Sequence, residues 1–152
     1  MTALEQQATI RWLNHPPRGT PRLTVGSESL TPSLPLNVDR HAAHPLATSP
    51  GELLAGVIGA AFATLHAEQL AREGTPAREL TASVTLTLSD ETGDGANLIL
   101  SAIGCRVLAR VPHIDQEQLE LGARAAMGRC IEALAMRPER LAVTVEALLE
   151  GA

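Results

Sequence analysis

The chain has 152 residues, of which 45% are hydrophobic and 19% are charged, and its formal net charge is −5. This length suits one domain with its own core and is short for two. The negative charge and the lack of a basic run argue against a nucleic-acid partner. The two cysteines form neither a disulfide framework nor a zinc ribbon, and no leader pattern opens the chain. We expect one cytoplasmic domain, 1–152, with no membrane partner and no cofactor or metal.

Prolines interrupt the sequence up to residue 47, so only short strands fit there. The hydrophobic residues between these prolines predict strands at residues 8–13, 23–25, 29–30 and 36–38.

The first long element is a helix from Ser49 to Gly74. Ser49 at the N-cap and Glu52 three residues later form a capping box, with proline at the first helical position. Gly74 can take the left-handed conformation that ends a helix. Both ends of this helix are therefore marked in the sequence.

The first half of this helix, Leu53 to Leu65, carries no charge and at 13 residues is too short for a membrane span. We expect a central helix that is covered on more than one side. His66 follows this half and is expected to be buried and hydrogen-bonded. The predicted apolar face comprises Leu54, Val57, Ile58, Ala61, Phe62 and Leu65, and the small residues that permit close approach are Ala55, Gly56, Gly59, Ala60 and Ala63.

The next segment predicts a β-hairpin. Apolar and hydroxyl side chains alternate from Leu80 to Leu88, which indicates a strand with one buried face. The Gly- and Asp-rich stretch Asp90–Asn97 predicts a turn. Residues Leu98–Val111 then form a returning strand that is expected to be largely covered on both faces.

Asp115 and Gln118 form a second capping box, which predicts the start of a second helix. Its apolar stripe comprises Leu119, Ala123, Ala126, Met127, Cys130, Ile131 and Leu134. Alternation over Leu141–Leu149 predicts a last strand. This order of elements favours an α+β fold in which an antiparallel sheet packs on two long helices.

The candidate reactive side chains are few. Cys130 could be a redox centre if an arginine lowered the pKa of its thiol, although a buried free cysteine is more often a small hydrophobic core residue. Cys105 is expected to be inert. His41 and His44 could bind a metal together with Asp39, but a loop lacks the fixed spacing of a helix, so solvated or dimer-contacting histidines are favoured.

Five motifs in order and spacing resemble the OsmC/Ohr proteins over about residues 23–149. They are Arg40, the T-S-P-x-E-L-L-A helix start at Thr48–Ala55, Ala60–Phe62, V-P-x-I-D at Val111–Asp115 and A-x-x-x-C at Ala126–Cys130. The resemblance implies a bacterial-type oxidative stress response protein. Its expected fold is an intertwined α+β homodimer that buries the central helices. Active family members reduce hydroperoxides with a peroxidatic and a resolving cysteine, and an Arg–Glu pair activates the first thiol.

The resemblance also shows which catalytic groups this chain lacks. The peroxidatic cysteine directly precedes the Phe of the central helix, Phe62 here, and that position is Ala61. The family glutamate falls at Gly51, and Glu52 cannot replace it because one helical step turns a side chain by about 100°. Arg40 matches the family arginine. Cys130 matches the resolving cysteine, although Ile131 follows it where many relatives have proline.

The favoured interpretation is a divergent OsmC-like protein whose two-cysteine peroxidase chemistry is lost or impaired. A small-molecule pocket that takes a hydrophobic or peroxide ligand would remain near Arg40, Ala61 and Cys130. One alternative is a one-cysteine thiol peroxidase that uses Cys130 with Arg40 and an external thiol reductant. The other is a structural dimer without a ligand. A second thiol within reach of the first would separate these hypotheses, and Cys105 is the only candidate.

Overall fold

The protein is described from a computed structural model, which covers residues 6–11, 22–27, 33–36, 47–90, 92–93 and 98–151. The chain divides into two compact units, residues 1–54 and residues 55–152. The assignment of 1–152 to one domain stays a prediction.

The first unit contains a small antiparallel sheet with the strand order β1-β2-β3. The first two strands fall where the sequence predicts them, whereas β3 begins two residues early, and Leu36 instead forms an isolated bridge with Thr48. Pro35 ends β3 on the edge of the sheet, where a missing N–H is tolerated. The predicted strand at 29–30 lies outside the described residues. The strands are β1 (Ala8–Arg11), β2 (Arg22–Val25) and β3 (Leu34–Pro35).

Helix α1 (Pro50–Arg72) begins and ends as predicted. The Ser49 amide donates to the Glu52 carboxylate at 2.7 Å, and the Glu52 amide donates to Ser49 Oγ at 3.1 Å. At the other end Gly74 has φ 80°, and the following Thr75 amide donates to the Leu70 carbonyl at 2.9 Å. This hydrogen bond, together with a left-handed glycine, closes many helices.

The second unit contains the predicted hairpin, with β4 (Glu79–Asp90) antiparallel to β5 (Leu98–Arg110). The register shifts between Thr87 and Leu88, which marks a β-bulge or irregularity. Beyond it the alternation fails: Leu88 is 45% exposed and Ile99 is 43% exposed. The prediction that β5 is covered on both faces is wrong in the single chain, because Arg106 is also exposed. The shift in register pairs Ile99 with Ser89 and accounts for Ile99 leaving the core.

Helix α2 (Gln116–Ala133) begins with the predicted capping box, in which Asp115 accepts from the Gln118 amide at 2.8 Å. All residues of the predicted stripe within the helix are buried. The following strand β6 (Ala142–Leu149) pairs with β5 in parallel. An all-antiparallel sheet was therefore the wrong expectation. Because α2 carries the chain back along the sheet, the next strand runs in the same direction as β5.

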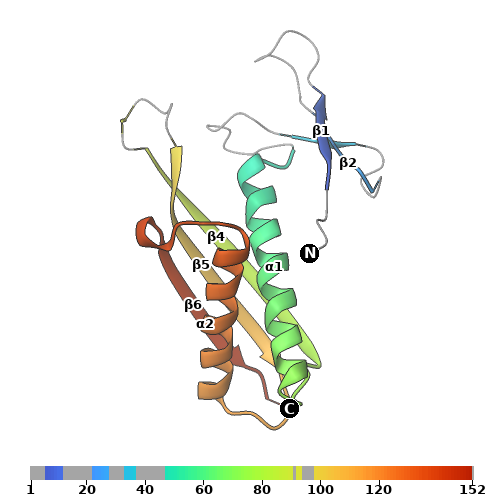
Figure 1. The fold of residues 1–152 in the computed structure, drawn as a ribbon, viewed down its shortest axis with the longest axis vertical. Helices are drawn as coiled ribbons and strands as arrows, with labels where there is room; N and C mark the ends of the chain where they lie inside the picture. Colours follow the sequence, from blue (N-terminus) through green and yellow to red (C-terminus); the bar gives the residue numbers. More distant parts are fainter. Residues whose placement is uncertain are drawn as a thin grey trace. The chain divides into compact units, whose positions relative to one another are not determined.

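The three strands form one sheet in the order β4-β5-β6, and α1 and α2 lie on the same face of it (Figure 1). The α+β fold class is confirmed. The buried core of this unit is formed by Ile58, Phe62, Leu70, Ile103, Cys105, Val107, Ala109, Val111, Leu119, Ala123, Ala126, Met127, Cys130, Ile131 and Ala147.

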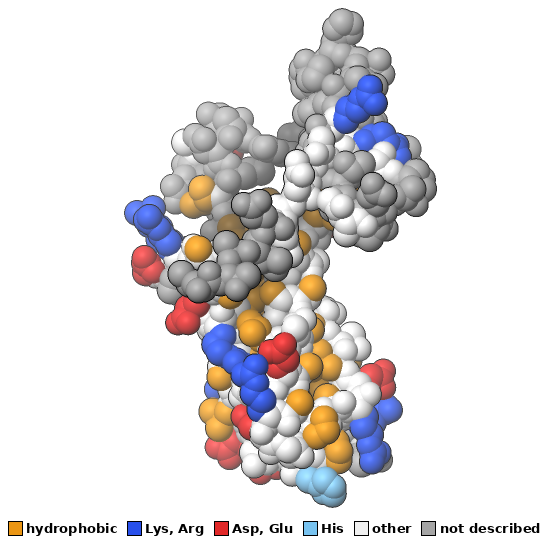
Figure 2. Space-filling view, turned by 45° about the vertical axis from the view of Figure 1, so that its right-hand side comes forward, with side chains coloured by type: hydrophobic (Ala, Val, Ile, Leu, Met, Phe, Trp, Pro, Cys, Tyr) orange, Lys and Arg blue, Asp and Glu red, His pale blue; other side chains and the backbone are white. Residues whose placement is uncertain are grey.

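Within the described residues, the fully buried side chains of α1 lie on one side of the helix. Its buried residues recur every four positions, at Ile58, Phe62, His66 and Leu70. On another face Leu54 is 39% exposed and Val57 is 53% exposed, so this face is open in the single chain, and its cover by a second copy stays a prediction. Figure 2 shows apolar side chains reaching the surface between groups of charged ones.

Helix α1 is also, by length and composition, the one helix in the described part of the chain that could cross a membrane. An 18-residue window has a mean hydropathy of 1.3, and 22% of it is buried inside the structure. Core helices of soluble proteins meet the same criterion. The uncovered apolar face therefore calls for a partner surface without specifying a membrane.

Candidate functional site

Cys130 of α2 packs directly against α1. Its side chain is fully buried, and its Sγ donates to the carbonyl oxygen of Ile58 at 3.7 Å. Ala61 follows Ile58 by three positions and is therefore on the next turn of the same helix. Phe62 is also fully buried beside this contact in the core cluster. The structure thus brings together Cys130 and the α1 segment that carries Ala61, the two positions that the resemblance assigns to the cysteine pair.

The environment of Cys130 disfavours its thiolate. Burial raises the pKa of the Cys130 thiol above its ordinary value. Burial, and to a lesser extent the Cys130 thiol, raise the pKa of Cys105 to about 11. Both thiols are free and buried, as the sequence indicated. Because the thiolate is the nucleophile, neither cysteine is activated at neutral pH by the groups that the structure describes.

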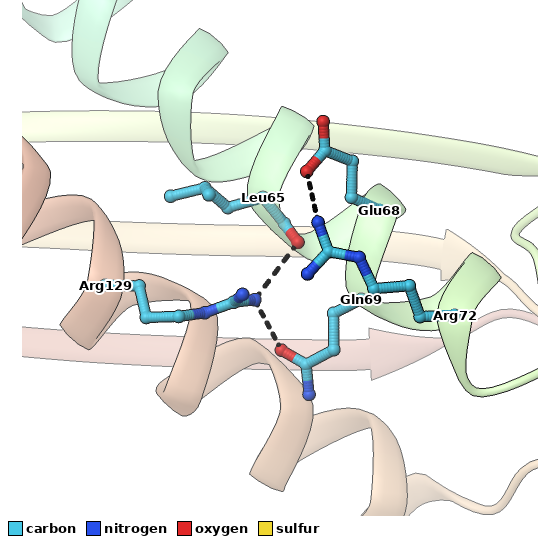
Figure 3. A network of polar contacts seen from close by, with 5 residues as sticks. All are labelled: Leu65, Glu68, Gln69, Arg72 and Arg129. Atoms are coloured by element: carbon cyan, nitrogen blue, oxygen red, sulfur yellow. Dashed lines mark hydrogen bonds and ion pairs between the residues drawn. The ribbon is translucent and has the colours of Figure 1, made fainter. Parts of the chain in front are cut away.

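Arg129 precedes Cys130, yet its cationic group is directed elsewhere. Its Nη2 donates to the Leu65 carbonyl at 3.2 Å and to the Gln69 side-chain oxygen at 2.9 Å. Figure 3 shows this side chain reaching from α2 across to α1. The guanidinium therefore ties the two helices together. Sequence analysis missed this contact, because nothing in the spacing distinguishes Arg129 from an ordinary surface arginine.

Gly51 lies in the first turn of α1, and a Cβ built there would meet only Ser49 Oγ at 3.8 Å. Position 51 therefore has room for a side chain. Glu52 is held in the capping box by the Ser49 amide, as expected, which leaves no carboxylate at position 51. Arg40, Asp39, His41 and His44 lie outside the described residues, so the predictions about them stay predictions.

His66 departs from expectation in one respect. It is fully buried on α1, as predicted, but neither ring nitrogen has a hydrogen-bond partner within the described part of the chain. Its ring lies 5.6 Å from that of Phe62, centroid to centroid. The expectation that it is hydrogen-bonded is therefore wrong. Within the described residues, no group of three His, Cys, Asp or Glu side chains could hold a metal ion.

No family model matches this sequence, and no curated protein matches it either. Comparison with solved structures gives a clear result over nearly the whole chain. The organic hydroperoxide resistance protein OhrB of Bacillus subtilis is similar with a TM-score of 0.69 and 18% identity, over 95% of this chain and 98% of its own. An OsmC-like protein of Mycoplasma pneumoniae gives a TM-score of 0.75 with 14% identity, over 99% and 100% of the two chains.

A third similar structure is a putative organic hydroperoxide resistance protein of Vibrio cholerae with captopril bound in one of its active sites. It gives a TM-score of 0.72 and 18% identity, over 97% of this chain and 93% of its own. At such identities the likeness reports on backbone architecture. The resemblance drawn from the five motifs and the architecture of the structure agree: this chain has the fold of the OsmC/Ohr proteins.

Proposed function

We propose that this protein is a divergent OsmC/Ohr-type homodimer that has lost two-cysteine hydroperoxide reduction, or retains it in severely impaired form. The observation that carries the proposal is the pairing of Cys130 with the α1 segment that has alanine at position 61. Cys130 supplies the thiol that the resemblance assigns to the resolving cysteine, whereas position 61, to which it assigns the peroxidatic cysteine, is alanine.

The chemistry explains why this substitution matters. A peroxidatic thiolate attacks one peroxide oxygen, the O–O bond breaks, and the alcohol leaves with a proton while the sulfur becomes a sulfenic acid. A second thiol then condenses with the sulfenic acid to form a disulfide and release water. Ala61 cannot perform the first step. The raised pKa of Cys130 makes it a poor substitute, because little thiolate forms near neutral pH.

The homodimer is part of the proposal and rests on the uncovered face of α1. Leu54 and Val57 are exposed there beside the small residues Gly56 and Ala60. A second copy of the chain would cover this face, and obligate interfaces of that type bury about 2,000 Å² or more. The retained pocket is proposed near Ala61 and Cys130 for a small hydrophobic or peroxide molecule. The captopril in the Vibrio cholerae protein supports a small-molecule site in this fold.

The test is hydroperoxide consumption with dithiothreitol or a dihydrolipoyl donor as reductant. We expect the natural protein to turn over cumene hydroperoxide no faster than a free thiol control, and Cys130→Ser to change this little. The double variant Ala61→Cys with Gly51→Glu should gain measurable activity, and Ala61→Cys with Gly51→Gln is its matched control. Fast turnover by the natural protein that Cys130→Ser abolishes would instead establish the one-cysteine peroxidase.

A further inference from the structure

An open cleft of about 460 Å³ lies within residues 55–152, between the C-terminal turns of α1 and the first turns of α2. It contains neither cysteine and none of the residues assigned to the hydroperoxide site. Its lining combines amide, hydroxyl and apolar groups: Gln69, Leu70, Glu73, Thr75, His113, Ile114, Gln118, Leu121, Gly122 and Ala125.

The unpartnered His66 imidazole lies directly behind this lining. A Cβ built on Gly122 would be 3.5 Å from His66 Nε2 and 3.6 Å from the Gln69 side-chain nitrogen. Both Gly122 and Gln69 line the cleft. The imidazole therefore lies directly behind Gly122 and Gln69, and because its ring nitrogens are buried, a ligand reaches Nε2 only when the Gln69 side chain moves aside.

Position 113 gives a second, independent indication. His113 has φ 66°, a left-handed conformation that residues with a side chain adopt rarely. Such conformations concentrate at binding sites. This one places an exposed histidine in the lining of the same cleft, at the turn before α2.

The charges of the cleft restrict what it can bind. Glu73 is the one acidic residue of the lining, and the lining contains no lysine or arginine. The nearby Arg129 is engaged with Leu65 and Gln69. An anionic ligand would therefore meet repulsion without a countercharge, while the lining offers Leu70, Ile114 and Leu121 to an alkyl chain.

The chemistry of the imidazole selects the polar group of the ligand. Burial lowers the pKa of His66, with Glu73 opposing this shift and Arg129 adding to it, so the ring is neutral near pH 7. A neutral imidazole has one donor and one acceptor nitrogen, and a hydroxyl group can serve either because it both donates and accepts. We propose that this cleft binds small aliphatic alcohols, with the hydroxyl inserted between Gln69 and Gly122 onto His66 Nε2 and the alkyl chain on the apolar lining.

The experiment uses the full chain labelled with ¹⁵N-histidine and 1-hexanol as the probe. We expect a saturable shift of the His66 ring nitrogens, and binding at least tenfold weaker for hexanoate because of Glu73. Gly122→Ala should weaken 1-hexanol binding at least tenfold, since the added methyl group would lie 3.5 Å from His66 Nε2, in the path of the hydroxyl. Gly128→Ala is the matched control on α2, because nothing lies within 4 Å of a Cβ there.

Each outcome decides the proposal. A shift confined to His113, or equal 1-hexanol affinity of Gly122→Ala and Gly128→Ala, would overturn it. Circular dichroism of both variants checks that the helices are retained. Because the assay monitors neither peroxide consumption nor a thiol, its result is independent of the proposed function.

Discussion

Replacing Gly59 by leucine tests whether α1 packs on the sheet as described. A Cβ at position 59 would lie 3.4 Å from Val84 Cγ2 of β4, which is already at the tight end of ordinary contact. Leucine adds three further carbons beyond that point. Overpacking of this kind typically costs about 1–3 kcal/mol. The contact partner is a strand, whereas close helix packing was expected from the sequence.

The control removes the contribution of helix propensity. Leucine is a better helix former than glycine by about 0.8–1 kcal/mol, so the net loss at position 59 is about 0–2 kcal/mol. Gly128→Leu has the same propensity gain without a clash, since nothing lies within 4 Å of a Cβ at position 128. The two variants should therefore differ by about 1–3 kcal/mol in free energy of unfolding.

Urea unfolding followed by circular dichroism measures this difference, at one protein concentration for both variants because self-association shifts apparent stability. In thermal unfolding the same difference corresponds to about 2–12 °C for a chain of this size. If Gly59→Leu is as stable as Gly128→Leu, α1 does not pack on β4 and the described arrangement of this unit is wrong.

Three further predictions follow from the same structure. Because the pKa of His66 is lowered in the folded state, its contribution to the free energy of unfolding is complete above the unfolded pKa of about 6.5 and decreases as the pH falls below that value, by at most about 1.4 kcal/mol per pH unit. His66→Met should flatten this pH dependence in urea unfolding, and an unchanged slope would assign the dependence to other groups. A thiol reagent such as DTNB should modify Cys105 and Cys130 only after unfolding, because both are buried; rapid modification of the native protein would contradict this. Sedimentation at micromolar concentration should give a dimer, and a monomer there would refute the proposed cover of α1.

Local signals made most of the fold predictable. Capping boxes at Ser49 and Asp115 mark helix starts because their short side chains accept hydrogen bonds from backbone amides of the first turn, which have no partner within the helix. Gly74 marks a helix end for a similar reason, since it adopts φ 80° without strain. These devices act within a few residues, so the sequence reveals them directly.

The errors arose where distant contacts decide the outcome. The direction of β6 depends on how α2 returns the chain along the sheet, and alternation alone is the same for parallel and antiparallel neighbours. The exposure of Ile99 depends on a register shift between β4 and β5 that no local pattern marks. The burial of Cys130 was predictable because it follows the helical period of α2, whereas the roles assigned to positions 61 and 51 rest only on the family resemblance and stay predictions.

The surroundings of His66 show why the cleft between α1 and α2 could not be predicted from the sequence. A buried histidine without a hydrogen-bond partner costs about 1–3 kcal/mol, and a methionine of similar size would avoid that cost. Arg129 adds to the cost of charging the ring, while its own hydrogen bonds hold α1 and α2 together at that level. Glycine at position 122 places no side chain between the buried imidazole and the cleft. Arg129 and Gly122 of α2 thus act on the same buried imidazole of α1, and this arrangement exists only once the two helices are packed.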